Sequence, residues 1–363
     1  MIPLFKVHVP NDIGQTIQKV FDSGVVTEGE YADRFERKFS ELISNENSSL
    51  LNSGTAALTL AYRMSDVGPN TEVITTPMTC MATNEPIHVM GAKIVFADID
   101  PETGNIDPDS VKKLLSKKTR AVVGVHWAGQ PYDISRLNDI VKNYNPSIRT
   151  IEDAAHALGA TYKNKPIGSH SDFTCFSFQA IKHLTTVDGG AISSLNAEDD
   201  QRIKRLRWFG LDRKYPGSKW EQDITESGYK FHMNNVNAAI GLAQMKHVQD
   251  IIRLHKKNSA LYDKQIINPK IKKLRRDHDS ESSAWIYTLL VEDRNKFKEY
   301  LQANEIASDV VHVRNDRYTV FEKFRNKNLP GTDYFCSRMI NIPVGWWLSD
   351  TDIEKVINVV NDY

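Results

Sequence analysis

One lysine of the 363-residue chain stands where it could form a covalent bond with a carbonyl group. Lys182 follows an apolar, β-prone run at residues 173–178, and a second β-prone run begins at Ala191. Between them lie hydroxyl side chains and the pair Gly189 and Gly190. A lysine amine on such a turn can form a Schiff base with a carbonyl cofactor. A solvated surface lysine on an ordinary loop is the alternative explanation.

A second candidate site is the polar turn at residues 52–55, which leads into a helix-like run of small residues. Gly54 and Thr55 would stand at the start of this helix. The free backbone N–H groups of a helix N-terminus bind anions, phosphate above all. An ordinary Ser or Thr helix cap would explain the same pattern.

A third candidate is Asp153, which ends the predicted strand at residues 148–153 and precedes two alanines. His156 lies three residues further on, close to the same side if the chain turns helically. A buried carboxylate is costly unless it meets a cation, and a protonated pyridine nitrogen would be such a cation. The alternative is a helix-capping aspartate beside a histidine satisfied in the core.

The elements that must position these groups alternate between strands and helices from residue 50 to residue 195. This alternation predicts an α/β fold with a largely parallel sheet that carries helices on both faces. In such sheets, ligands bind beyond the carboxyl ends of the strands. The polar positions just after predicted strands are therefore the candidates: Thr76, Asp98, His126, Asp153 and the loop that holds Lys182.

The C-terminal part predicts a second, smaller α/β domain. A long helix beginning near Asn234 leads into it, and it contains a strand at 285–292, a helix at 294–306 and another strand at 308–313. A loop and a terminal helix capped by Ser349 follow. We expect a large cofactor-binding domain at residues 1–245 and a small domain at 246–363.

Composition excludes several classes of protein. The formal net charge is +0, which predicts no electrostatic recruitment of nucleic acid or of an anionic membrane. The 3 cysteines are widely spaced, which argues against a disulfide framework and a metal site. Residues 1–14 lack a long apolar signal segment, and no apolar run is long enough to span a bilayer. A cytoplasmic protein is expected.

Three separated stretches occur in the order seen in one known family: NSGTAAL, IEDAAHALG and FSFQAIKHLTTVDGG. With them, nearly the whole chain resembles the StrS/DegT-type nucleotide-sugar aminotransferases. The resemblance implies a pyridoxal-phosphate (PLP) enzyme of fold type I, with a mostly parallel, mixed sheet in the large domain and a smaller C-terminal α/β domain. It also implies a homodimer with composite active sites.

The resemblance assigns roles by position. Lys182 stands where the family's lysine binds the cofactor and moves the proton between substrate carbons. Asp153 stands where an acid pairs with the pyridine nitrogen, and His156 where a side chain contacts the ring hydroxyl. The residues that match the phosphate cradle are Gly54, Thr55 and Ser177.

Two positions depart from the family pattern. Lys230 stands where many relatives have an asparagine that reaches the cofactor phosphate of the neighbouring subunit, and His232 replaces an arginine. A lysine can still serve a phosphate as a point charge, so Lys230 is kept as a cofactor-binding candidate. Cys80 replaces the usual aromatic residue over the cofactor ring, and a thiol offers no π-stack.

The resemblance implies that L-glutamate donates an amino group to a keto-sugar carried on a nucleotide. Basic and aromatic candidates for binding that substrate are Trp208, Arg213, His312 and Arg314. A histidine at the position of Lys182 would indicate a sugar dehydratase, so that branch is disfavoured. A PLP-binding sensor without turnover and a transaminase of a non-nucleotide keto-sugar remain alternatives. The sugar, the nucleotide and the choice between C3 and C4 stay open.

Overall fold

A seven-stranded mixed sheet forms the framework of the computed structural model, which describes residues 1–213, 215–218 and 221–363. Strand β9 pairs antiparallel with β1 and β8, whereas the pairs from β8 through β5, β4 and β2 to β3 are parallel. The expected α/β organisation around a mostly parallel sheet is confirmed. In spatial order the strands are β1 (Ser48–Leu51), β9 (Gly190–Ser194), β8 (Phe173–Ser177), β5 (Arg149–Asp153), β4 (Thr119–Val125), β2 (Glu72–Thr75) and β3 (Lys93–Phe96).

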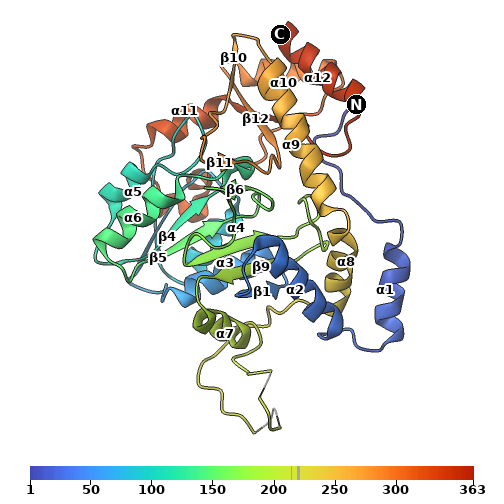
Figure 1. The fold of residues 1–363 in the computed structure, drawn as a ribbon. Helices are drawn as coiled ribbons and strands as arrows, with labels where there is room; N and C mark the ends of the chain where they lie inside the picture. The colour runs from blue at the N-terminus through green and yellow to red at the C-terminus, as the bar shows by residue number, and fades with distance from the viewer. Residues whose placement is uncertain (214, 219–220) are drawn as a thin grey trace.

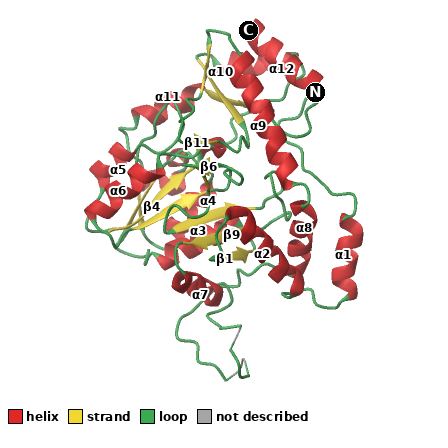
Figure 2. Cartoon of the chain, in the orientation of Figure 1, coloured by secondary structure: helices red, strands yellow, loops and turns green. Residues whose placement is uncertain are grey.

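Helices cover both faces of this sheet, because successive strand residues point to opposite sides. Val122 of β4 packs in one apolar cluster and Val123 packs in the other. Figure 2 shows the strands between the two sets of helices. The Val122 side carries α2 (Glu30–Ile43), α5 (Pro108–Leu114), α6 (Ile134–Tyr144) and α8 (Asn235–Met245), and the Val123 side carries α3 (Gly54–Met64), α4 (Met81–Val89) and α7 (Ala197–Leu206).

A smaller antiparallel sheet with its own apolar core lies above the large sheet in Figure 1, near both chain ends. Ile2 belongs to this core and pairs with Ile306. The elements of this part are β10 (Ile271–Lys273), β12 (Tyr287–Val291), β13 (Met339–Ile342), α9 (Val248–Gln265), α10 (Arg294–Ala303), α11 (Pro330–Arg338) and α12 (Asp350–Asp362).

The remaining elements connect or flank these two parts. Helix α1 (Ile13–Asp22) packs beside α8 (Figure 1), and a short sheet joins β6 (Thr161–Tyr162) to β7 (Lys165–Pro166) and β11 (Ser280–Glu281). The short 3₁₀ helices are η1 (Trp127–Gly129), η2 (Asn315–Arg317) and η3 (Thr319–Phe324). Within the described part of the chain, no helix combines the length and apolar character needed to cross a membrane.

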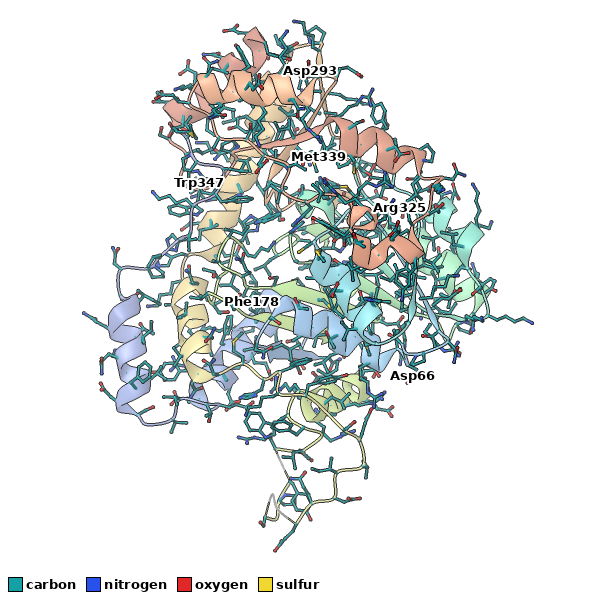
Figure 3. The ribbon with its side chains drawn as sticks, turned by 180° about the vertical axis from the view of Figure 1, so that it is seen from behind. Asp66, Phe178, Asp293, Arg325, Met339 and Trp347 are labelled. Carbon is teal, nitrogen blue, oxygen red and sulfur yellow. The ribbon has the colours of Figure 1, made fainter. Side chains whose placement is uncertain are left out.

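Two expectations for the C-terminal part are wrong. The segment 308–313 is not a strand: only Asp309 pairs with Asn341, and the third strand of the small sheet is β13. We call the region built on the small sheet the small part and the region built on the seven-stranded sheet the large part. In Figure 3, Met339 of β13 lies in the small part and Phe178 lies in the large part. The helix expected from about Asn234 is divided at Lys246 and His247 into α8 and α9, and Val248 and Ile252 at the start of α9 still pack in the same core as α8. Ala238 lies in the core of the large part and Tyr262 in the core of the small part.

Candidate functional site

A cavity of about 330 Å³ opens where several strands of the large sheet end and helix α3 begins. This position beyond the carboxyl ends of parallel strands is where α/β sheets bind ligands. The cavity brings together most of the residues singled out from the sequence. Those that line it are Gly54, Thr55, Cys80, Asp153, His156, Ser177, Lys182 and His312.

Lys182 lies in the loop between β8 and β9, where its backbone N–H donates to the carbonyl of Gln179 over 2.9 Å. Its Nζ lies 3.6 Å from the centre of the Trp285 ring. Burial lowers the pKa of Lys182 to about 7, although the nearby Asp153 and Cys80 oppose the shift. A large fraction of this amine is therefore uncharged near neutral pH, and the uncharged amine is the nucleophile.

This pKa predicts the pH dependence of the reaction between Lys182 and pyridoxal phosphate. Because the uncharged fraction falls about tenfold per pH unit below the pKa, the rate should fall likewise below about pH 7 and level off above it. Stopped-flow absorbance after mixing the apoprotein with pyridoxal phosphate measures this rate. A rate that keeps rising to about pH 10, as for an ordinary lysine, would contradict the low pKa.

Asp153 is the last residue of β5 and is 4% exposed. Its Oδ1 accepts a hydrogen bond from the backbone N–H of Ala155 over 3.1 Å, and its Oδ2 accepts one from the Thr83 hydroxyl over 2.6 Å. These two bonds hold the carboxylate in one orientation at the cavity wall. A buried carboxylate held in this way is suited to pair with a cationic ring nitrogen.

The start of α3 meets the ends of β8 and β9 at another wall of the cavity. Ser53 caps the helix, and its hydroxyl accepts from the Ala56 N–H over 3.0 Å. The ordinary capping explanation is therefore correct for Ser53, and the N–H groups of Gly54 and Thr55 still have no intrahelical acceptor. A methyl group at Gly190 would lie 2.5 Å from the Ser53 carbonyl, so glycine is needed for this close approach. The free N–H groups at the start of α3 can therefore bind an anion such as phosphate.

A stack of three rings forms part of the cavity wall. The His156 ring stacks on the Trp285 indole at 3.8 Å, and His156 Nε2 lies 3.2 Å from His312 Nε2. Burial, followed by the charge of Lys182, lowers the pKa of His156 well below its ordinary value and that of His312 to about 3. Both rings are thus neutral, and the Nε2–H of one donates a hydrogen bond to the Nε2 of the other.

Cys80 is the N-cap residue of α4, where its side chain makes no capping hydrogen bond, and it is exposed and lines the cavity. The position at which this chain has Cys80 and many relatives have an aromatic residue therefore lies at the cavity. The aromatic surface that contacts Lys182 comes instead from Trp285 of the C-terminal part. Trp285 is held there because its Nε1–H donates to the Ile181 carbonyl over 2.8 Å.

Three other candidates form a separate cluster outside the cavity lining. Lys230 Nζ lies 3.4 Å from the centre of the Trp208 ring, and the Arg213 guanidinium lies 4.7 Å from it. Arg213 also lies 3.4 Å from a carboxylate oxygen of Glu28. Within one chain, the cluster of Trp208, Arg213 and Lys230 does not line the cavity. The contact with a cofactor phosphate that the sequence predicts for Lys230 therefore requires a second subunit.

Arg314 is also absent from the described residues that line the cavity. Its guanidinium makes two hydrogen bonds with Asp316, at 2.6 Å and 2.7 Å, and a further one with Asp333. These carboxylates balance its charge and fix the 314–316 turn. Binding of a substrate diphosphate by Arg314 stays a prediction.

Two residues at the site escaped sequence reasoning. Trp285 precedes β12, and its sequence context indicates only the start of a buried strand. Thr83 lies inside α4, where a threonine commonly bonds to its own helix. The run of hydroxyl residues around a strand end, at positions 75, 76, 79 and 83, was the available signal for a polar network there.

Comparison with known proteins identifies relatives along the full chain. The model of the DegT/DnrJ/EryC1/StrS aminotransferase family matches residues 8–361. SpsC of Bacillus subtilis, a spore coat polysaccharide biosynthesis protein, is 30% identical over 96% of this chain and 93% of its own length. The sugar aminotransferase CalS13 of Micromonospora echinospora has a TM-score of 0.96 at 36% identity, covering 100% of both chains.

Spr1654 of Streptococcus pneumoniae has a TM-score of 0.91 at 29% identity in its PLP form, over 99% of this chain and 98% of that one. It is also known in a PMP (pyridoxamine phosphate) form. These likenesses confirm the expected PLP fold type I. The family match over nearly the whole chain shows that this protein belongs to the DegT/DnrJ/EryC1/StrS family of PLP-dependent aminotransferases, whose structural neighbours here are sugar aminotransferases.

Proposed function

We propose that the protein uses pyridoxal phosphate to transfer the amino group of L-glutamate to a nucleotide-linked keto-sugar. The observation that carries this proposal is the Lys182 amine, with a pKa of about 7, in one cavity with Asp153. The amine can bond to a carbonyl carbon, and the carboxylate can hold a ring cation. A protein that only binds a ligand has no need of such an amine.

The residues of the cavity fit this cofactor at three separate points. The N–H groups at the start of α3, with Thr55 and Ser177, would hold the phosphate. Asp153 would pair with the ring nitrogen. Within the described residues, Nδ1 of His156 is buried without a hydrogen-bond partner, which suits a contact with the ring hydroxyl. Each point uses a polar residue that lines the cavity.

When bound, pyridoxal phosphate supplies an electron-poor ring that accepts the electron pair left when a proton leaves the carbon beside an amino group. Lys182 does the remaining chemistry. Its uncharged amine would hold the cofactor through the carbonyl carbon, with release of water, and the same amine, once free, would move a proton from one carbon to another. Asp153 would keep the ring nitrogen protonated, and the Trp285 ring, 3.6 Å from Nζ, would limit where the freed amine can move.

The substrate is proposed to lie between two subunits of a cytoplasmic homodimer. Within one chain the cluster of Trp208, Arg213 and Lys230 does not line the cavity, whereas a partner's copy could approach it. Lys230 would then meet the cofactor phosphate, and Trp208 and Arg213 the nucleotide. His312, inside the cavity, would contact the sugar.

Spectroscopy of the purified protein tests the proposal. Protein loaded with pyridoxal phosphate should absorb near the violet edge of the visible range. L-glutamate should abolish that absorbance because its amino group is left on the cofactor as pyridoxamine phosphate, which has no carbon–nitrogen double bond conjugated to the ring. A nucleotide-linked keto-sugar added afterwards should restore the absorbance and yield an amino-sugar detectable by mass spectrometry. Persistence of the absorbance with every amino donor would refute transamination and favour a sensor. Restoration by a free keto-sugar alone would refute the nucleotide requirement.

A further inference from the structure

A buried asparagine of the C-terminal part is bonded to the loop that leads into α4. Asn315 is 1% exposed and lies in η2, three residues after His312. Its backbone N–H donates to the Pro77 carbonyl over 2.7 Å, and its Nδ2 donates to the Thr79 carbonyl over 2.8 Å. Its Oδ1 accepts from Asn84 Nδ2 over 2.8 Å. One side chain thus fixes both the loop and the first turn of α4.

The surrounding turn is itself held rigidly, so Asn315 can act as an anchor. The Arg314 guanidinium bonds to both carboxylate oxygens of Asp316, which is 2% exposed as a side chain. Arg325 Nε, beyond η3, donates to the Asp316 carbonyl over 2.8 Å. Figure 3 shows Arg325 at a level between Met339 of the small part and Phe178 of the large part.

From the loop, a chain of hydroxyl groups leads to Asp153. The Thr79 and Thr83 hydroxyls lie 2.7 Å apart, and Thr83 Oγ1 lies 2.6 Å from Asp153 Oδ2. An ionised carboxylate only accepts, so the single Thr83 proton points to Asp153 and Thr79 must donate to Thr83. Thr79 is 2% exposed and Thr83 0% exposed. Because both side chains are almost fully shielded from solvent, the loss of one donor leaves its acceptor without an equivalent partner, at a cost in free energy.

We propose that Asn315 is a positioning residue for the cofactor site, acting through Thr79 and Thr83 on the carboxylate of Asp153. Asn315 places the Thr79 backbone, Thr79 orients the Thr83 hydroxyl, and Thr83 fixes the rotation of the carboxylate toward the ring nitrogen. The inference rests on the proposed function, since it requires a pyridine nitrogen at Asp153. It connects the segment that carries His312 to the residue that governs the ring.

The test uses 4-deoxypyridoxine 5′-phosphate, which has the ring and phosphate of the cofactor but a methyl group in place of the aldehyde. It cannot bond to Lys182, so its binding reports the ring contacts alone. Two quantities are measured on the apoprotein: the Kd, and the pH at which the bound ring nitrogen loses its proton, read from near-ultraviolet absorbance. Thermal unfolding of each variant confirms that it is folded.

Thr83→Val removes the hydroxyl at nearly constant volume. We expect Kd to rise about tenfold and the ring nitrogen to lose its proton about one pH unit lower, because the carboxylate is no longer oriented toward it. Thr83→Ser restores the donor and should stay within about twofold of wild type. Asn315→Ala, which keeps the backbone bond to Pro77, should shift both quantities in the same direction, about threefold in Kd.

Thr174→Val is the matched control. The Thr174 hydroxyl is also buried and also donates to a carboxylate of β5, Glu152, over 3.2 Å. It lies outside the described cavity lining, so this variant should bind the probe as wild type does. If Thr83→Val fails to fold, the result for Asn315→Ala tests the proposal by itself. Asn315 does not line the cavity, so it can affect binding of the probe only through other residues.

The outcomes separate the two proposals. Wild-type binding that Thr83→Val and Asn315→Ala leave unchanged overturns the positioning role while the proposed cofactor stands. The positioning role is also overturned if Thr174→Val shifts both quantities as much, since the effect would then be general softening of the sheet. A wild-type protein that does not bind the probe overturns the cofactor and this inference together.

Discussion

Replacement of Lys182 by alanine is expected to abolish transamination, with a loss of at least about 10⁴-fold in kcat. The reason is that one side chain supplies both the nucleophile for the cofactor carbonyl and the base that moves the proton, and general acid–base catalysis alone contributes roughly 10²–10⁴-fold. The violet absorbance should also be missing after addition of pyridoxal phosphate. Absorbance spectra and kcat with L-glutamate measure the two effects.

A second measurement locates the bond chemically. Borohydride reduction of the loaded wild-type protein should attach the cofactor permanently to Lys182, as read from peptide masses. Lys113→Ala, an exposed lysine on α5 far from the described cavity lining, serves as the matched control and should keep wild-type absorbance and kcat. Retention of the absorbance by Lys182→Ala, or a reduced adduct on another lysine, would show that the assignment is wrong.

Asp153→Asn should give the next largest effect, a fall of roughly 10²–10³-fold in kcat. Asparagine keeps the size of the side chain, and its Oδ1 can still accept from the Ala155 N–H, while its Nδ2 would donate to the Thr83 hydroxyl instead of accepting from it. It removes the negative charge, so the ring nitrogen of the cofactor loses its proton and the ring becomes a weaker electron acceptor. Steady-state kinetics and a pH titration of the cofactor absorbance measure the change.

Glu152→Gln is the control for removing a buried charge from the same strand. Glu152 is fully buried, lies 3.0 Å from His126 Nε2 and does not belong to the described cavity lining. Glu152→Gln should lower the thermal stability, because it weakens the buried hydrogen bonds that Glu152 makes with His126 and Thr174, yet keep kcat within about threefold. Equal losses of kcat in both variants would mean that the charge of Asp153 acts on the fold rather than on the cofactor.

The local order of the chain was predictable for physical reasons. Alternating apolar runs with helical segments between them can bury their surfaces only in a layered sheet, and this places the ends of the parallel strands side by side. Asp153, Ser177 and the turn at Gly54 stand at such ends, so their meeting around one cavity follows from connectivity. Lys182 follows in the loop after β8 for the same reason.

The C-terminal part was predicted less well because short apolar runs do not reveal their partners. Residues 308–313 and 339–342 both contain apolar residues, and only the second run pairs with β12 along its length. The first run stays outside the small sheet and carries His312 into the cavity. Arg314 shows a similar limit, since one of its two carboxylate partners, Asp333, lies nineteen residues away in the chain.

What the sequence alone determined is the set of groups at the strand ends of the large sheet, because these depend on periodicity and chain order. Tertiary structure decided what acts on those groups. Trp285 reaches Lys182 and Asn315 reaches the loop before α4 only because the C-terminal part packs onto the large sheet. The pKa of Lys182, about 7, likewise arises from burial. The spacing of residue types along the chain does not reveal which distant segments will be in contact or which side chains will be shielded from water.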